Sequence, residues 1–286
     1  MKFTKMHGSG NSYIHINCFE EQVENPAALA VRMSDKNFGV GADGIILIKP
    51  SGKVIDGSGA RADCFMEIYN ADGSQAEMCG NGIRCVAKFM YDNRLVSGTV
   101  INVDTLSGVK RISLTVGDGV CTAAEVNMGR PILEAADIPC TLVKTGAVLD
   151  HKLDVCGRTL GVTCVSMGNP HCIVVVDDPW SFPVEVIGPA LERHPAFPAR
   201  VNVSFISLPS TGGIKVRTWE RGSGETLACG TGNCASLVAA TLLGLCGGEA
   251  DTFPAGGKLH IRWDRDSDEV CMTGPAEAIF SGEWSI

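Results

Sequence analysis

The stretch Cys79-Gly80-Asn81-Gly82 has a second copy in the chain, Cys229-Gly230-Thr231-Gly232. In each copy a thiol stands just before glycines, at the predicted start of a helix. A helix start offers unpaired backbone N–H groups and the positive end of the helix dipole, which attract anions and lower the pKa of a cysteine. We therefore expect the two thiols to face one small anionic substrate, where one removes a proton and the other returns it.

A helix is predicted after each copy. Apolar side chains recur with helical spacing after the first one, at Ile83, Val86, Ala87 and Met90. That spacing predicts a helix with one buried face. The segment 235–245 after the second copy is apolar almost all round, so we expect a helix that is buried on every side.

Other landmarks recur in the same order, 150 to 159 residues apart. The repeated pairs are Gly10-Asn11 with Gly168-Asn169, Asp43 with Asn202, Tyr69-Asn70 with Trp219-Glu220, and Cys79 with Cys229. Such a repeat indicates a duplicated domain. Two related domains would set their matching loops across a cleft, where both halves could reach one ligand.

The rest of the chain predicts mainly short strands, which are apolar segments bounded by turn residues. We expect them at 13–16, 45–48, 64–69, 100–103, 111–116, 172–176, 201–206, 216–219, 259–263, 270–273 and 278–280. A short helix is expected over 27–33, and 50–63 reads as a mobile surface loop. Gly117-Asp118-Gly119 predicts a hairpin turn or a domain joint.

Composition limits the function. At 286 residues, with about 150 per domain, the chain predicts two domains. A net charge of -8 without a basic, aromatic-rich cluster argues against nucleic acid, and no apolar run nears the ~18 residues of a membrane span. Thirteen cysteines without a secretion signal predict reduced thiols in a cytoplasmic protein. Their spacing does not match a metal site, so neither a metal nor a cofactor is expected.

The doubled motif suits proton transfer at an amino-acid α-carbon. Removing that hydrogen places negative charge on the carboxylate, and a site without an electron-sink cofactor must stabilise it electrostatically. The backbone N–H groups of the two helix starts could do so, and they belong to Gly80, Asn81, Gly230 and Thr231. A thiol pKa of ~8.5 is easily tuned, so one sulfur can be thiolate while the other is protonated.

Polar residues next to strand ends could hold the zwitterionic ends of the substrate. They are Asn70, Asn169, Asn202, Glu220 and Arg221. Each turn asparagine could equally be a local backbone cap. His171 could orient a thiol, although a lone histidine can also be purely structural.

These residues resemble the diaminopimelate epimerase family over nearly the whole chain. The matching stretches are Lys5 to Asn11, Gly39 to Gly44, Asn70 to Ser74, Cys79 to Cys85, Gly168 to His171, Val201 to Val203, and Arg217 to Gly232. The resemblance implies an α/β (α+β) fold of two pseudo-symmetric domains, each a β-barrel-like sheet around a central helix, with the active site in the interdomain cleft. We assign 1–118 with 276–286 to the first domain and 119–275 to the second.

The resemblance also implies the site residues and the reaction. Cys79 and Cys229 would be the acid and base of a cofactor-independent epimerase acting on diaminopimelate, in lysine and cell-wall biosynthesis. The substrate would be bound by Asn11, Asn70, Asn169, Asn202, Glu220 and Arg221, with Gly80, Asn81, Gly230 and Thr231 on the reacting carboxylate.

The chain departs from the family pattern near the first thiol. Ser12 and Tyr13 stand where the family usually has Asp and Phe, and further differences fall at Asn17, Glu67 and Ser204. Two alternatives therefore stay open: a racemase of another amino acid such as histidine, and a relative that binds amino acids without turnover. The sequence does not fix the oligomeric state, and a homodimer is one of the states it allows.

Overall fold

The computed structural model describes residues 1–55 and 59–285, and the chain divides into two compact units. One unit contains residues 1–127 and 273–286, and the other contains Met128–Met272. Each is described by itself below. The domain boundaries predicted from the sequence, at 118/119 and 275/276, remain a prediction. Part of the predicted loop over 50–63, residues 56–58, lies outside the described residues, and Val54 and Arg61 form an isolated bridge beside it.

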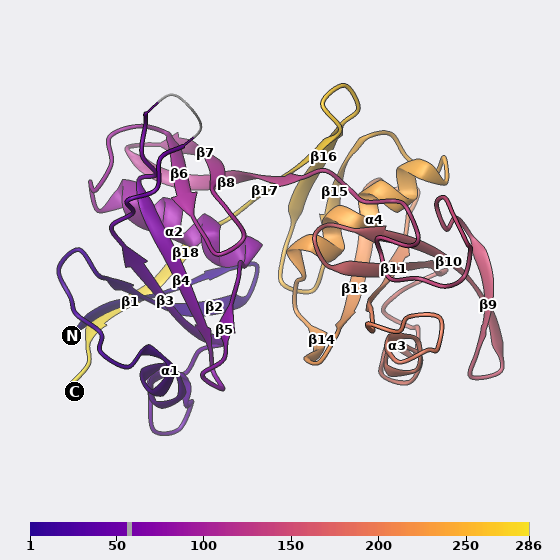
Figure 1. Ribbon diagram of the computed structural model, residues 1–286, viewed down its shortest axis with the longest axis horizontal. Helices are drawn as coiled ribbons and strands as arrows, with labels where there is room; N and C mark the ends of the chain where they lie inside the picture. The colour runs from indigo at the N-terminus through magenta and orange to yellow at the C-terminus, as the bar shows by residue number, and fades with distance from the viewer. Residues whose placement is uncertain (56–58, 286) are drawn as a thin grey trace. The chain divides into compact units, whose positions relative to one another are not determined.

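The first unit is built from nine strands and two helices of the described chain (Figure 1). The strands are β1 (Lys2–Gly8), β2 (Asn11–Asn17), β3 (Gly44–Lys49), β4 (Cys64–Asn70), β5 (Gln75–Ala76), β6 (Val100–Asp104), β7 (Lys110–Gly117), β8 (Val120–Gly129) and β18 (Glu277–Glu283). The helices are α1 (Pro26–Ser34) and α2 (Gly80–Asp92). Pairing runs β18, β1, β2, β3, β4, β6, β7, β8, and it is parallel at β2–β3 and at β4–β6. The β7–β8 hairpin confirms the turn predicted at 117–119.

The second unit repeats this order. Its strands are β9 (His151–Val155), β10 (Arg158–Ser166), β11 (Pro170–Val175), β12 (Asn202–Ser207), β13 (Ile214–Glu220), β14 (Gly224–Thr226), β15 (Glu249–Phe253), β16 (Leu259–Asp264) and β17 (Glu269–Gly274). Its helices are α3 (Val184–Glu192) and α4 (Gly230–Leu242). Pairing runs β9, β10, β11, β12, β13, β15, β16, with the parallel pairs at β11–β12 and β13–β15.

The two series correspond strand for strand. Strands β1 to β4 match β10 to β13, the short β5 matches β14, and β6 and β7 match β15 and β16. The parallel pairs fall at the same steps in both units. The duplication predicted from three sequence landmarks is therefore confirmed by the topology, and the mixed α+β fold of two pseudo-symmetric domains is confirmed with it.

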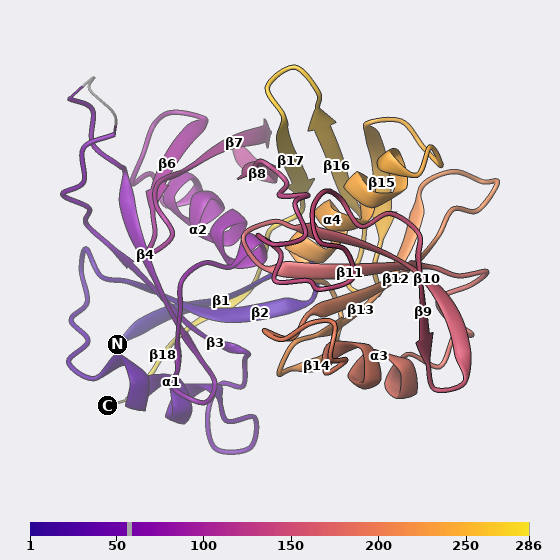
Figure 2. The same cartoon turned by 45° about the vertical axis from the view of Figure 1, so that its right-hand side comes forward.

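One helix in each unit is surrounded by its own strands (Figures 1 and 2). Helix α2 packs on β1, β2, β6 and β7, and α4 packs on β10 to β13 and on β15 and β16. Residues 232–240 of α4 are all buried, which confirms the first part of the prediction over 235–245. The rest of that prediction was wrong, because α4 ends at Leu242 and Leu245 is exposed. The prediction of a single buried face for α2 was wrong, because residues 81–90 are buried all round, including Arg84 and Lys88.

The buried cations of α2 are satisfied by backbone oxygens. Arg84 is fully buried and donates to the carbonyl oxygens of Gly80 and Pro275. Lys88 donates to the Cys121 carbonyl oxygen at 2.6 Å and pairs with Asp92. Amphipathic periodicity fails here because two polar side chains enter the core, where each finds one partner on α2 and one, Pro275 or Cys121, that is distant in the sequence.

The second helix of each unit packs on the outside of its strands. Asn25 caps α1 by accepting from the Ala28 N–H, and Pro26 occupies its first turn, where no N–H is needed. The sequence missed α3, because Pro183 stands at its N-cap and Pro189 lies inside it, and prolines usually signal a break. Helix α3 packs on β12 and β13 over the apolar core of the second unit.

Glycine at position 8 allows β1 to approach the start of α2. A Cβ atom built on Gly8 would lie 2.9 Å from the Asn81 carbonyl oxygen and 3.0 Å from Arg84 Nη2. We predict that Gly8→Ala lowers the free energy of unfolding by about 1–3 kcal/mol, because backbone atoms must move. Urea denaturation followed by circular dichroism measures the change.

Gly98→Ala is the matched control, because its nearest neighbours would lie 3.8 Å from the new Cβ. Equal stability of the two variants would contradict the close approach.

Candidate active site

Each of the two motif cysteines occupies the N-cap of a buried helix. Cys79 has extended backbone angles (φ −138, ψ 116) and α2 begins at the next residue. Cys229 has similar angles (φ −105, ψ 110) immediately before α4. The predicted position of both thiols at a helix start is therefore correct. The first N–H groups of a helix have no acceptor within it, and this is why helix starts attract anions.

The first thiol is held by a polar network within its unit. Cys79 Sγ donates to Asn11 Oδ1 at 3.3 Å, and the Gly82 N–H points at the same sulfur from 3.4 Å. Asn11 Nδ2 donates to Asp43 Oδ2 at 3.0 Å, and that carboxylate also accepts from the Ser12 N–H at 2.7 Å. Asp43 was noticed in the sequence only as a landmark of the repeat, and its place in this network was missed.

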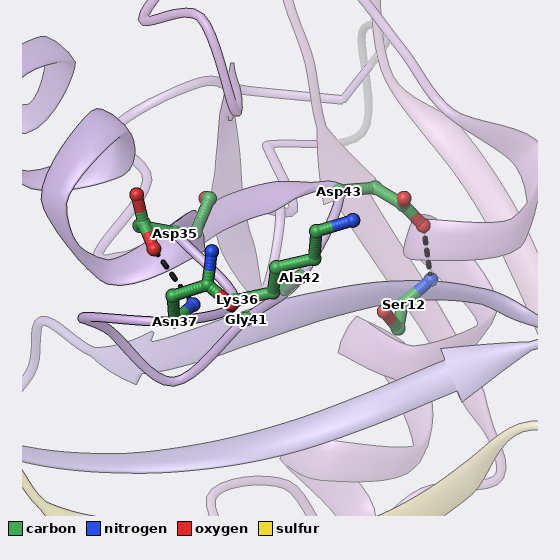
Figure 3. A pocket seen from close by; sticks show the side chains of 8 residues that line it. Ser12, Asp35, Lys36, Asn37, Gly41, Ala42 and Asp43 are labelled. Atoms are coloured by element: carbon green, nitrogen blue, oxygen red, sulfur yellow. Dashed lines mark hydrogen bonds between the residues drawn. The ribbon is translucent and has the colours of Figure 1, made fainter.

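A pocket opens next to Ser12 and Asp43 (Figure 3). Its remaining lining is Ser34, Asp35, Lys36, Asn37, Gly41 and Ala42. Figure 3 shows the Lys36 side chain extended in the direction of Asp43, while Asp35 is turned to the Asn37 N–H. Ser12, a departure from the family pattern, thus lies on the wall of a pocket whose other side chains are largely polar.

The other predicted residues of the first unit are partly used in local structure. Asn70 Nδ2 donates to Ser74 Oγ at 3.0 Å in the turn after β4, which agrees with the local-cap reading of this side chain. Asn81 Oδ1 accepts from Arg84 Nη2 at 3.0 Å. The substrate-binding roles of Asn11, Asn70, Gly80 and Asn81 remain predictions.

The second thiol faces a carboxylate. Cys229 Sγ donates to Glu220 Oε2 at 3.1 Å and lies 3.5 Å from Thr231 Oγ1. The other Glu220 oxygen accepts from Thr226 at 2.6 Å, which fixes the carboxylate. Burial, and then the negative charge of Glu220, raise the pKa of the Cys229 thiol well above its ordinary value. This sulfur is therefore held in its protonated form.

His171 is connected to this thiol through Thr231. Its Nε2 lies 3.0 Å from Thr231 Oγ1 and 3.1 Å from Asn169 Oδ1. Burial, and then the charge of Arg221, lower the pKa of His171 to about 3, so the imidazole is neutral near pH 7. His171 does not contact the Cys229 sulfur itself. It can orient the Thr231 hydroxyl, which lies next to that sulfur.

The turn after β13 carries Arg221 and is hydrogen-bonded to Asn202 of β12. The Arg221 N–H donates to Asn202 Oδ1 at 2.8 Å, and Asn202 Nδ2 donates to the Pro170 carbonyl oxygen at 3.0 Å. Arg221 Nη1 donates to the Ala199 carbonyl oxygen. Buried Glu192 of α3 accepts from the Gly222 N–H at 3.2 Å. The sequence missed Glu192, since a glutamate in an unpredicted helix gives no signal of its own.

Three of the other departures from the family pattern, Asn17, Glu67 and Ser204, make side-chain contacts within the first or second unit. Glu67 pairs with Lys49 and accepts from the Tyr69 hydroxyl. Asn17 accepts from the Phe19 N–H. Ser204 is fully buried, and its Oγ lies 3.0 Å from Thr218 Oγ1. None of these contacts changes the surroundings of either thiol directly.

Within residues 1–55 and 59–285, no three His, Cys, Asp or Glu side chains are grouped so that they could hold a metal ion. No helix in the described part of the chain is long and apolar enough to cross a membrane.

The fold matches that of a solved hydroxyproline epimerase from Agrobacterium vitis, with a TM-score of 0.71 and 16% identity over 99% of this chain and 91% of that one. The protein is an isomerase of the racemase and epimerase class, with one cysteine at the start of each central helix. Within that class the chain belongs to the diaminopimelate epimerase family, whose model matches residues 3–134 and 163–279.

Two curated relatives cover the chain from end to end. A diaminopimelate epimerase of Acetivibrio thermocellus is 48% identical over 283 residues, which are 99% of this chain and 98% of the relative. A diaminopimelate epimerase of Methanococcus maripaludis is 45% identical over 286 residues and all of both chains.

The carboxylate of Glu220 gives a testable effect on the second thiol. We predict that Glu220→Gln lowers the pH midpoint for alkylation of Cys229 by about one unit, because a nearby negative charge is removed. Iodoacetamide labelling across pH, with peptide mass spectrometry, measures the midpoint at this cysteine.

Glu225→Gln makes the same chemical change on β14, where the carboxylate pairs with Arg217. An unchanged midpoint in Glu220→Gln, or an equal shift in Glu225→Gln, would contradict the assignment.

Proposed function

We propose that the protein inverts one α-carbon of diaminopimelate, from the L,L to the meso form, by acid/base catalysis with two thiols and without a cofactor. Membership of the diaminopimelate epimerase family supports the substrate. The observation that carries the mechanism is the cysteine at the N-cap of each buried helix. Binding alone would not need a thiol at both helix starts, so turnover is favoured over a silent binding protein.

The reaction moves one proton off the α-carbon and another onto its opposite face. A thiolate takes the α-proton and becomes a thiol, and the electron pair spreads into the substrate carboxylate. The second thiol then gives its proton to the carbon and becomes a thiolate. The two sulfurs thus exchange protonation states in each turnover, and the reverse reaction uses them in the opposite roles.

Stabilisation of the carbanion falls to the helix starts. We assign the reacting carboxylate to the backbone N–H groups of Gly80, Asn81, Gly230 and Thr231. These donors belong to the first turns of α2 and α4, and the helix dipole adds to their effect. Donors fixed in position need no reorganisation as the charge develops, which is why a site of this kind can work without an electron sink.

The remaining residues would hold the amino-acid groups of the substrate. We assign this role to Asn11, Asn70, Asn169, Asn202, Glu220 and Arg221. The fixed turn around Asn202 and Arg221 supports binding of an anionic end, and Glu220 offers a carboxylate to an ammonium group. His171 would orient Thr231 and thereby Cys229.

The setting of the protein is part of the proposal. The catalytic thiols must stay reduced to act as acid and base, and a chain with thirteen cysteines suits the reducing conditions of the cytoplasm. A net charge of -8 supports a small-molecule substrate over nucleic acid. A homodimer remains a prediction from the sequence.

The two thiols can be tested by substitution. We predict that Cys79→Ala and Cys229→Ala each reduce epimerisation of L,L-diaminopimelate by about 10²- to 10⁴-fold, because each removes one acid/base group. Chiral chromatography of the product measures the rate. L-histidine and other L-amino acids, offered to the wild-type protein, should show no comparable turnover.

Cys18→Ala and Cys246→Ala are the matched controls, one in each unit and both partly exposed. Full activity in either catalytic variant would overturn the two-thiol mechanism. Brisk turnover of another amino acid, with none of diaminopimelate, would overturn the substrate.

A further inference from the structure

The carboxylate of Glu192 is buried against the turn that follows β13. Glu192 belongs to α3, which lies beside β13 and β14 (Figure 2). The residue is only 2% exposed, so the partners of its oxygens must come from the protein. Oε2 accepts from the Trp219 indole N–H at 2.9 Å, and Oε1 accepts from the Gly222 N–H at 3.2 Å.

These two donors flank the pair Glu220-Arg221, to which we assign substrate binding. One carboxylate of α3 therefore holds both ends of a four-residue stretch, and the two middle residues carry the side chains proposed to meet the substrate. The Arg221 N–H is held in addition by Asn202 Oδ1 at 2.8 Å.

The same carboxylate reaches the loop that holds the Arg221 guanidinium. Arg200 Nη1 lies 3.6 Å from Glu192 Oε1. Its neighbour Ala199 provides the carbonyl oxygen that accepts from Arg221 Nη1 at 2.8 Å. Glu192 is thus bonded to the backbone on both sides of Arg221 and paired with the residue next to the acceptor of its guanidinium.

Close packing fixes the face of α3 that carries Glu192. A Cβ on Gly188, four residues before Glu192, would lie 2.7 Å from Trp219 Cγ. Residues four apart share one face of a helix, so the face that contacts the indole ring also presents the carboxylate. Glu192 therefore has little freedom to leave the turn.

The equivalent turn of the first unit is held differently. Helix α1 has no acidic residue in its sequence, and the turn after β4 is bonded through its own side chains, with Asn70 Nδ2 donating to Ser74 Oγ. In the repeat Ala71 corresponds to Arg221, so this turn carries no cation that must be directed. The buried carboxylate thus belongs to the unit whose turn carries an arginine.

We infer that Glu192 is a positioning residue, which fixes the Glu220-Arg221 turn and so holds the Arg221 guanidinium in place for an anionic group of the substrate. The inference rests on the proposed substrate-binding role of Arg221 only for its effect on catalysis. A side chain fixed in advance loses less freedom when the substrate binds, so affinity is gained without any direct contact by Glu192.

The first test is hydrogen exchange of the backbone over residues 219–224, followed by peptide mass spectrometry. We expect Glu192→Gln to speed exchange at Gly222 and its neighbours by about tenfold, because one carboxylate oxygen becomes an NH₂ group that cannot accept. Glu185→Gln is the matched control, since it makes the same change on α3 at an exposed carboxylate that pairs with Arg217. Unchanged exchange in Glu192→Gln, or an equal increase in Glu185→Gln, would overturn the inference.

The second test asks whether Glu192 acts through Arg221. Glu192→Gln should raise the KM for L,L-diaminopimelate about tenfold and change kcat by less than about threefold, because substrate binding is weakened while both thiols remain. The double variant with Arg221→Ala should have the same KM as Arg221→Ala alone, since Glu192 would then have no guanidinium to hold. Effects that add in the double variant would overturn the inference.

The alkylation midpoint of Cys229 separates this role from one through Glu220. The Glu220 carboxylate has its own support from Thr226 at 2.6 Å, so the Cys229 midpoint in Glu192→Gln should equal that of the wild type. A shifted midpoint would contradict action through Arg221.

The wild-type protein decides the matter if Glu192→Gln fails to fold. Labelled with ¹⁵N-glycine, it should show exchange at the Gly222 amide about 100-fold slower than in an open chain, as expected for a buried hydrogen bond. Exchange at the open-chain rate would overturn the inference. If the wild type does not epimerise diaminopimelate, the proposed function fails, whereas the exchange measurements still decide whether Glu192 holds the turn.

Discussion

The first turn of a buried helix imposes the constraint on which each unit depends. Its backbone N–H groups cannot be satisfied inside the helix, and burial removes the water that would otherwise bind them. In α2 the Cys79 sulfur accepts from the Gly82 N–H, and a helix start of this kind also attracts anions. Cys229 stands at the corresponding place before α4, where its side chain makes no capping hydrogen bond. One residue in each unit, the cysteine between extended chain and helix, is therefore both the N-cap of the helix and the proposed acid/base group.

Close packing sets the shape of both first turns. A Cβ on Gly82 would lie 2.7 Å from Ile46 Cδ1, and a Cβ on Gly232 would lie 3.1 Å from Ser204 Oγ. Ile46 and Ser204 occupy corresponding strands, β3 and β12, of the repeat. The fourth residue of each motif is thus a glycine because the helix start touches its sheet. The duplication preserved this contact while it changed the side chain on the strand.

The two copies have diverged in the groups that face the sulfur. Asn11 approaches Cys79, whereas Glu220 and Thr231 approach Cys229. A reaction that needs one thiolate and one thiol gains from such a difference, because two identical sites would favour the same protonation state. The side chains that differ between the two sites lie at strand ends and in turns, which tolerate change. Both sites keep a cysteine followed by glycine at the helix start.

Much of this could be predicted from the sequence, for physical reasons. The thiol positions, the repeat and the buried helix α4 follow from local patterns, such as glycines after a cysteine and an apolar run. Helix α3 could not be predicted, because its two prolines indicate a break in the chain. The burial of Arg84 could not be predicted either, because its acceptor at Pro275 is brought near only by the fold. Asp43 and Glu192 were missed for the same reason: each acts through partners distant in sequence.

The most direct test of two thiols acting in turn is the fate of the α-hydrogen. L,L-diaminopimelate is incubated with the wild-type protein in deuterated water, stopped at an early time, and each isomer is examined by mass spectrometry. The account predicts one deuterium at the inverted carbon of the meso product, while the remaining L,L isomer keeps its hydrogen, because the incoming proton comes from a second sulfur in exchange with solvent. Product that retains the hydrogen of the substrate would contradict it, since a single base would then have carried that hydrogen from one face to the other.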